Sequence, residues 1–233
     1  MAGSISPNIV TDGLIFYIDP TNSNSYTAGS ETVFDISKNG KNCSLVNGVT
    51  YSSLAQGSLS FDGVDDYAVV PALGLLNDFT VSCWFRVIGS STASTVNQYA
   101  SLLTIGSTQK ILVRTSNNPL LRYALVSMGT DSNDYISTNL FTYGSWNNLT
   151  FTYDSITDKG CIYLNNVKTE FTNSTVRYTN SSRYIGTQTV PPSTAEYEYI
   201  LRGNISNFLI YNRELSEVEV TNNYNVLRGK FER

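Results

Sequence analysis

The side chains best placed to do chemistry are three aspartates in one short turn. Asp62, Asp65 and Asp66 lie within the sequence Phe61-Asp-Gly-Val-Asp-Asp-Tyr67. Hard cations such as Ca2+ prefer clustered carboxylate, carbonyl and amide oxygens. The alternative is that Asp62 and Asp65 only cap the turn, because aspartate side chains accept hydrogen bonds from nearby backbone N–H groups. A calcium site at Asp62, Asp65 and Asp66 is therefore one of two hypotheses for this turn.

Catalytic chemistry has few candidates in this chain. It contains no histidine, which excludes Ser-His-Asp and Cys-His catalysis and histidine-based zinc sites. Glu196 and Glu198 have the alternating spacing of the carboxylates in a glycosidase strand, but they lack a third acid. The three cysteines have no C-x-x-C spacing, so neither a disulfide framework nor a metal site is expected. We expect a protein that is not an enzyme, and glycoside hydrolysis is the weakest alternative.

Aromatic and polar side chains suggest a second kind of site. Exposed aromatic rings can stack on sugar rings, while asparagine, aspartate and arginine make polar contacts with sugar hydroxyls. Five residues are candidates for glycan binding: Trp84, Arg86, Tyr123, Tyr197 and Tyr199. For each of them the alternative is an ordinary role in the core or in a cross-strand pair.

The elements that must position these residues are predicted to be strands. Residues 79–87 alternate between apolar and mixed side chains, so one face belongs to the core and the other is a second buried layer or a binding face with Trp84 on it. Further strands recur at short intervals, for example near Leu120–Met128 and Tyr135–Phe141, which is typical of a sandwich or barrel. Residues 1–10 are expected to form an arm, residues 11–229 one domain and residues 230–233 a tail.

One helix is predicted near the C-terminus, over residues 215–228. Ser216-Glu-Val-Glu219 is a capping box, in which Ser216 and Glu219 satisfy amide donors that would otherwise be unpaired. Leu215 and Val220 occupy the positions of a hydrophobic staple. We expect this short helix to lie across the sandwich, because a helix of this length depends on tertiary packing.

Charge and hydropathy exclude some partners. The net charge is −4 and the pI is about 4.8, which argues against a nucleic-acid footprint of clustered lysine and arginine. No apolar run approaches the ~20 residues of a transmembrane helix, so membrane insertion is not expected. The first residues lack the basic and apolar regions of a signal peptide, and we expect synthesis and retention in a cytoplasm.

Several motifs, in this order, resemble the laminin-G-like and pentraxin-like jelly rolls of the concanavalin A-like lectin/glucanase superfamily. They are Gly13-Leu-Ile-Phe-Tyr-Ile-Asp19, Phe34-Asp-Ile-Ser-Lys-Asn-Gly40, Leu59-Ser-Phe-Asp-Gly-Val-Asp-Asp-Tyr67, Phe79-Thr-Val-Ser-Cys-Trp-Phe85, Trp146-Asn-Asn-Leu-Thr-Phe-Thr-Tyr-Asp154, Ile162-Tyr-Leu-Asn165, Tyr184-Ile-Gly186 and residues 203–216. The resemblance implies an all-β fold, a jelly-roll sandwich of two antiparallel sheets, here with one short C-terminal helix. Members of the family often bind calcium at a sandwich edge.

The end of the chain carries a narrower resemblance. Tyr211-Asn-Arg-Glu-Leu-Ser216 and Asn225-Val-Leu-Arg-Gly-Lys-Phe231 are similar to copies found in large tailed-phage virion proteins. This similarity implies a non-catalytic virion structural protein, made in the host cytoplasm, that decorates a capsid or a tail appendage. Its partners would be other virion subunits or further copies of itself. The alternative is a carbohydrate-binding module, with or without calcium, that recognises cell-surface glycans.

Overall fold

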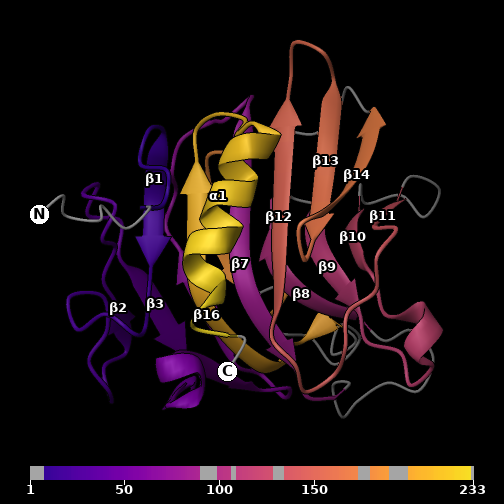
Figure 1. The fold of residues 1–233 in the computed structure, drawn as a ribbon. Helices are drawn as coiled ribbons and strands as arrows, with labels where there is room; N and C mark the ends of the chain where they lie inside the picture. The colour runs from indigo at the N-terminus through magenta and orange to yellow at the C-terminus, as the bar shows by residue number, and fades with distance from the viewer. Residues whose placement is uncertain are drawn as a thin grey trace, which may run out of the picture.

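A computed structural model describes residues 8–89, 99–105, 109–127, 134–172, 179–188 and 199–231. The described chain is an antiparallel β-sandwich with one α-helix, α1 (Glu217–Arg228), as expected from the sequence. In Figure 1, α1 lies across the face of the nearer sheet, over β16 and β7. Within the described residues no helix is long and apolar enough to cross a bilayer.

The first layer is an eight-stranded sheet. Its central strands are β7 (Phe79–Val87) and β16 (Arg202–Tyr211), which pair with each other. The remaining strands are β12 (Asn147–Asp154), β13 (Lys159–Leu164) and β14 (Val167–Thr172) on one side and β5 (Ser58–Asp62), β4 (Thr50–Ser52) and β1 (Leu14–Ile18) on the other.

The second layer consists of two four-stranded sheets that meet edge to edge. One contains β11 (Tyr135–Ile136), β10 (Ala124–Ser127), β9 (Lys110–Arg114) and β8 (Tyr99–Thr104). The other contains β15 (Arg183–Ile185), β6 (Tyr67–Val70), β3 (Cys43–Val46) and β2 (Thr32–Val33). The Tyr184 N–H donates to Thr104 Oγ1 (2.9 Å) and the Gly186 N–H to the Ser101 carbonyl (3.2 Å), which joins β15 to β8.

Two expected strands are shorter than the sequence pattern indicated. Residues Pro119–Leu121 form a 3-10 turn, η2, in which the Asn118 side chain accepts from the Leu120 N–H, and β10 begins only at Ala124. The strand expected over residues 135–141 ends at Ile136, because Ser137 Oγ accepts from the Ala124 N–H and donates to the Asn139 carbonyl. Local side-chain bonds of this kind compete with strand pairing.

Both faces of β7 are buried, but in different cores. Phe79, Val81, Cys83, Phe85 and Val87 point into the space between the two layers, as the alternation predicted. On the opposite face, Trp84 belongs to a second cluster that includes residues of α1. The mixed face of this strand is therefore a second buried layer, which was one of the two expected possibilities.

The helix closes this second core. Ser216 and Glu219 form the predicted capping box, and Arg213 pairs with Glu219 at 2.6 Å. Leu215 and Val220, the predicted staple residues, are both buried. The hydrogen bond from Arg213 is the largest influence on the pKa of Glu219. It outweighs the opposing effect of burial and lowers that pKa to about 2. The helix start is thus fixed by side chains that also join α1 to the strand before it.

The ends of the described chain pack more tightly than an arm and a tail would. The Val10 N–H donates to Asn223 Oδ1 (2.8 Å) and Tyr211 Oη to the Val10 carbonyl (2.9 Å), which ties residues 8–10 to α1 and β16. Lys230 pairs with Asp19 at 2.9 Å, and the Phe231 ring stacks on Trp84. The expected arm therefore lies outside the described residues except for residues 8–10, and the expected tail contributes Lys230 and Phe231 to the fold.

The acidic turn carries the chain from one layer to the other. β5, before the turn, pairs with β16 and β4 in the first layer, whereas β6, after it, pairs with β3 and β15 in the second. Gly63 takes φ +82°, and a Cβ there would lie 2.7 Å from Arg202 Cβ. A residue with a side chain at this position would be both strained and crowded.

Candidate functional site

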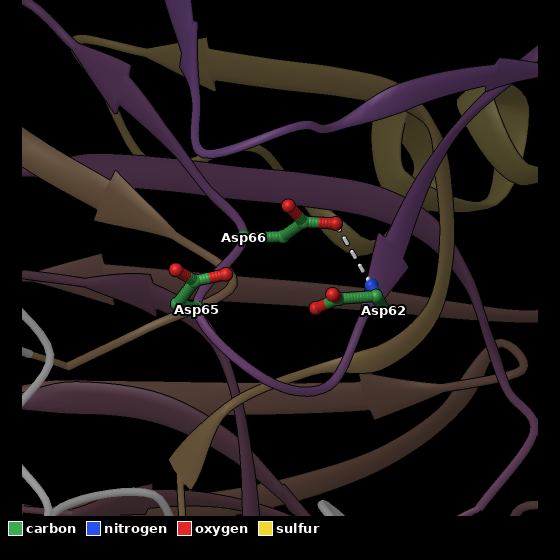
Figure 2. Close-up of side chains that lie close together, drawn as sticks. All are labelled: Asp62, Asp65 and Asp66. Atoms are coloured by element: carbon green, nitrogen blue, oxygen red, sulfur yellow. Dashed lines mark hydrogen bonds between the residues drawn. The ribbon is translucent and has the colours of Figure 1, made fainter.

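Asp62, Asp65 and Asp66 meet at this crossover between the layers. Figure 2 shows the carboxylates of Asp62 and Asp65 pointing toward each other, with the Asp66 carboxylate beside them. The Asp62 N–H donates to Asp66 Oδ2 (2.9 Å), and Asp62 Oδ1 accepts from the Val64 N–H (2.7 Å). The capping role expected for Asp62 is therefore present. The Asp65 carbonyl, in turn, accepts from Asn47 Nδ2 at 3.1 Å.

The Asp66 carboxylate is in an unfavourable electrostatic position. Its residue is only 3% exposed, and the buried Oδ1 atom has no hydrogen-bond partner among the described residues. Burial raises the pKa of Asp66 to about 6, and the negative charges of Asp62 and Asp65 add to this effect, while the hydrogen bond from the Asp62 N–H opposes it. A buried carboxylate with one unpartnered oxygen is stabilised by a proton or by a cation.

The oxygens of the three aspartates fit a hard cation. One carboxylate oxygen from each residue lies within 4.8 Å of the others. Two ligands of one calcium ion, each at about 2.4 Å, can be at most about 4.8 Å apart. Within the described residues no lysine or arginine forms an ion pair with the three, although Arg202 lies opposite Asp62 on the neighbouring strand. Asp62, Asp65 and Asp66 would hold the metal, and solvent would complete its coordination.

The structure contradicts a direct glycan-binding role for Trp84. The residue is 2% exposed and lies beneath the C-terminal segment, where its ring stacks on Phe231 (centroids 4.2 Å apart) and on Tyr224 (5.5 Å). A sugar cannot reach this ring while the helix and Phe231 are in place. The sequence pattern marked the correct face of the strand but not the helix that covers it.

Arg86 lies on the same side of the first layer as Trp84, but it borders a cleft. Its Nε donates to the Gly144 carbonyl (2.7 Å) and its Nη1 to Asn204 Oδ1 (3.4 Å). The cleft, of about 360 Å3, is also lined by Trp146, Lys230 and Phe231. Arg86 therefore has mainly a structural role, because its hydrogen bonds join β7 to the loop that contains Gly144 and to β16.

Tyr123 and Tyr199 come together on the outer face of the second layer. Together with Tyr99, Arg114 and Lys110 they form what we call the tyrosine cluster. The Tyr99 and Tyr199 rings stack with centroids 5.8 Å apart, and Arg114 Nη1 donates to Tyr123 Oη at 2.9 Å. Lys110 Nζ lies 5.3 Å from the centre of the Tyr199 ring. All five residues are partly exposed.

Electrostatics and packing hold the tyrosine cluster in one arrangement. The Arg114 guanidinium lies 5.6 Å from the Tyr123 ring centre and 6.0 Å from that of Tyr99, distances at which a cation is attracted to an aromatic face. Burial, and next the neighbouring Tyr123, raise the pKa of Tyr99 to about 12. The Tyr99 phenol therefore stays neutral at physiological pH, while Arg114 and Lys110 supply positive charge.

Sequence reasoning missed part of this cluster. Lys110 and Arg114 alternate along β9 with Ile111 and Val113, which point into the core, and this period of two marks them as outward-facing. Tyr99 is the partner of Arg114 in the adjacent strand. That pairing depends on strand register, which the sequence alone did not supply. Tyr197, Glu196 and Glu198 lie outside the described residues.

A family model described as the concanavalin A-like lectin/glucanases superfamily matches residues 62–221. The chain belongs to this superfamily. The matched region begins at the acidic turn and includes the tyrosine cluster. No curated protein matches the sequence.

Several solved structures share this superfamily fold. Domain 4 of the arabinanase AbnA from Geobacillus stearothermophilus, in complex with arabinotriose, has a TM-score of 0.65 and 16% identity, over 91% of this chain and 98% of that one. The binding domain of Paraclostridial Mosquitocidal Protein 1 gives 0.68 and 19%, over 92% and 52%. A heptameric pentraxin from Limulus polyphemus gives 0.57 and 10%, over 70% and 79%. At these identities the likenesses show the fold alone.

Proposed function

We propose that this superfamily member is a non-catalytic carbohydrate-binding module. The observation that carries the proposal is the tyrosine cluster, which places three partly exposed rings beside Arg114 and Lys110 on one face. Aromatic rings with a few fixed polar groups are the usual composition of a small-ligand site. The likeness to an arabinanase domain that is seen with an arabinose oligosaccharide supports this choice.

The charge of the cluster suggests which glycans it prefers. Arg114 and Lys110 both lie within cation–π distance of the tyrosine rings. An arginine can pair with a carboxylate or sulfate through two parallel hydrogen bonds. We therefore expect glycans with acidic sugars to bind here better than neutral ones.

Calcium binding at Asp62, Asp65 and Asp66 is part of the same proposal. It is supported by the buried, unpartnered oxygen of Asp66 and by the spacing of the three carboxylates. Bound calcium would supply the missing positive charge and would hold β5 and β6 together at the crossover. Its role there would be to stabilise the fold, because the tyrosine cluster is formed by other strands.

The virion placement and synthesis in a host cytoplasm stay predictions. The motifs that suggested them have structural uses in this fold: Arg213 and Ser216 fix the start of α1, and Phe231 covers Trp84. These motifs therefore do not distinguish a virion protein from another module with the same closing helix. A virion protein that holds particles near host glycans would combine both ideas.

A glycan array tests the proposed function. The purified protein is screened on immobilised glycans in calcium and again in chelator, alongside Tyr123→Ala. We expect the wild type to bind acidic glycans on the array and Tyr123→Ala to lose this binding. Binding that is equal for wild type and Tyr123→Ala would exclude the tyrosine cluster, and the absence of any bound glycan would refute the proposal. Chelator should weaken binding only to the extent that it lowers thermal stability.

A further inference from the structure

A cleft at the edge of the sandwich lies apart from the tyrosine cluster. We call it the edge cleft: a hollow of about 470 Å3 between the loop that contains Tyr26 and Glu31 and the segment Leu45–Tyr51, which crosses from β3 to β4. Sites for small molecules usually have volumes of about 300–1,000 Å3. The edge cleft is therefore large enough for one or two sugar rings.

A preformed aromatic platform lies in this cleft. The Tyr26 and Tyr51 rings stack with centroids 5.8 Å apart and an interplanar angle of 21°. Tyr26 is 5% exposed and supports the pair from inside, whereas Tyr51 is 38% exposed. Since Tyr26 covers one face of the Tyr51 ring, the exposed part of that ring is available to a ligand. Large exposed aromatics of this kind are held at low conformational cost and suit recognition.

The loop beneath the platform is fixed by buried hydrogen bonds. Ser25 Oγ accepts from the Asp19 N–H (3.0 Å) and donates to the Phe34 carbonyl (2.8 Å), next to Tyr26 in the sequence. The Leu45 N–H donates to the Glu31 carbonyl (2.8 Å), which joins the loop to β3. A ligand would therefore meet an organised surface and would lose little affinity in ordering it.

The rim of the cleft is polar and carries negative charge. Glu31, Asn47 and Thr50 are all exposed and line it, while the described lining residues include no lysine or arginine. Asn47 and Gly48 also connect the edge cleft to the acidic turn, because Asn47 Nδ2 donates to the Asp65 carbonyl. A carboxylate accepts hydrogen bonds from ligand hydroxyls but repels an anionic ligand. This charge is opposite to that of the tyrosine cluster.

We propose that the edge cleft is a second carbohydrate site, which binds a neutral sugar ring. The apolar face of the sugar stacks on Tyr51, and its hydroxyls donate to the Glu31 carboxylate and to the exposed oxygen groups of the rim. The inference rests on the proposed function, because it assumes that the module recognises glycans. It adds a separate site with the opposite preference for charge, so that the chain can engage two parts of a glycan or two glycans.

Neutral methyl glycosides, tested in calcium-containing buffer, probe the cleft directly. Saturation-transfer NMR identifies a bound glycoside, and titration calorimetry then compares wild type with Tyr51→Ala and Glu31→Gln. We expect Tyr51→Ala to weaken binding by about tenfold or more, the equivalent of about 1.4 kcal/mol. Glu31→Gln, an exposed substitution that preserves shape, should weaken it several-fold. Tyr123→Ala is titrated in parallel to measure any contribution of the tyrosine cluster. Tyr184→Ala, at a partly exposed tyrosine outside both sites, is the matched control and should bind the same glycoside as well as wild type does.

The outcomes separate this inference from the proposed function. Neutral-sugar binding that survives in both Tyr51→Ala and Glu31→Gln overturns the edge-cleft site. If Tyr123→Ala alone abolishes all binding, the proposed function stands and the second site is excluded. If the wild type binds no neutral glycoside while it still binds acidic glycans on the array, the second site is likewise excluded. A thermal melt of each variant shows whether it is folded before its binding is interpreted.

Discussion

Asp66 lies in an environment that disfavours its negative charge. It is buried beside two further carboxylates, and one of its oxygens has no partner among the described residues. The aspartates were found from sequence because their spacing is unusual. The burial of Asp66 was not, because it depends on the turn passing between two sheets rather than joining two paired strands. A local pattern cannot distinguish these two arrangements.

The pKa of Asp66 leads to a pH dependence of stability. Its folded value of about 6 is above the ordinary 3.8, so the folded state holds this proton more tightly. In chelator, this group therefore stabilises the fold below about pH 4, and that stability is lost as pH rises through 6. The change is worth at most about 3 kcal/mol. We expect Asp66→Asn, which mimics the neutral acid, to melt higher than wild type at pH 7.5 but not at pH 4.

Calcium should offset this difference in stability at neutral pH. A ligand present at about 100 times its dissociation constant stabilises the folded state by about 2.7 kcal/mol. Wild type at pH 7.5 should therefore melt higher in calcium than in chelator, while Asp66→Asn should respond much less. Melting curves of both proteins, recorded with calcium, magnesium or chelator, measure this difference. Equal curves in all three buffers would exclude a metal site at these aspartates.

Helix α1 determines which face of the first layer is available. It covers Trp84, Tyr211 and Leu209, so the outer face of β7 and β16 has become a second core. The capping box and the staple were predictable because their signals are local to Ser216–Val220. The docking of Phe231 on Trp84 was not, because these residues are far apart in the sequence. For the same reason Trp84 was a reasonable glycan candidate from sequence and is a packing residue in the structure.

Replacing Trp84 tests the packing role of the helix. Trp84→Ala removes a buried ring from between β7 and the C-terminal segment and should destabilise the fold by about 3–5 kcal/mol. Trp84→Phe keeps a stacked ring against Phe231 and should cost less. Denaturant unfolding measures both. If Trp84→Ala melted like wild type but lost glycan binding, the assignment of Trp84 to the second core would be contradicted.

At the scale of the whole molecule, the two layers separate three features. The closing helix lies on the outer face of the first layer, the tyrosine cluster on the outer face of the second, and the acidic turn and edge cleft at the crossovers between layers. The all-β class and the single helix followed from periodicity and from the order of motifs. The positions of the sites could not be predicted in this way. They depend on strand register and on which connections between the two layers lie at the same edge of the sandwich.

The central claim is that this module binds glycans without cleaving them, through the tyrosine cluster. The most direct test is calorimetric titration of the strongest array glycan into wild type, Tyr123→Ala and Tyr51→Ala, followed by analysis of the recovered glycan. We predict saturable binding of an intact acidic glycan by wild type and Tyr51→Ala, and a loss of about tenfold or more in affinity for a folded Tyr123→Ala. Unchanged affinity in Tyr123→Ala, or recovery of a shortened glycan, would contradict the account.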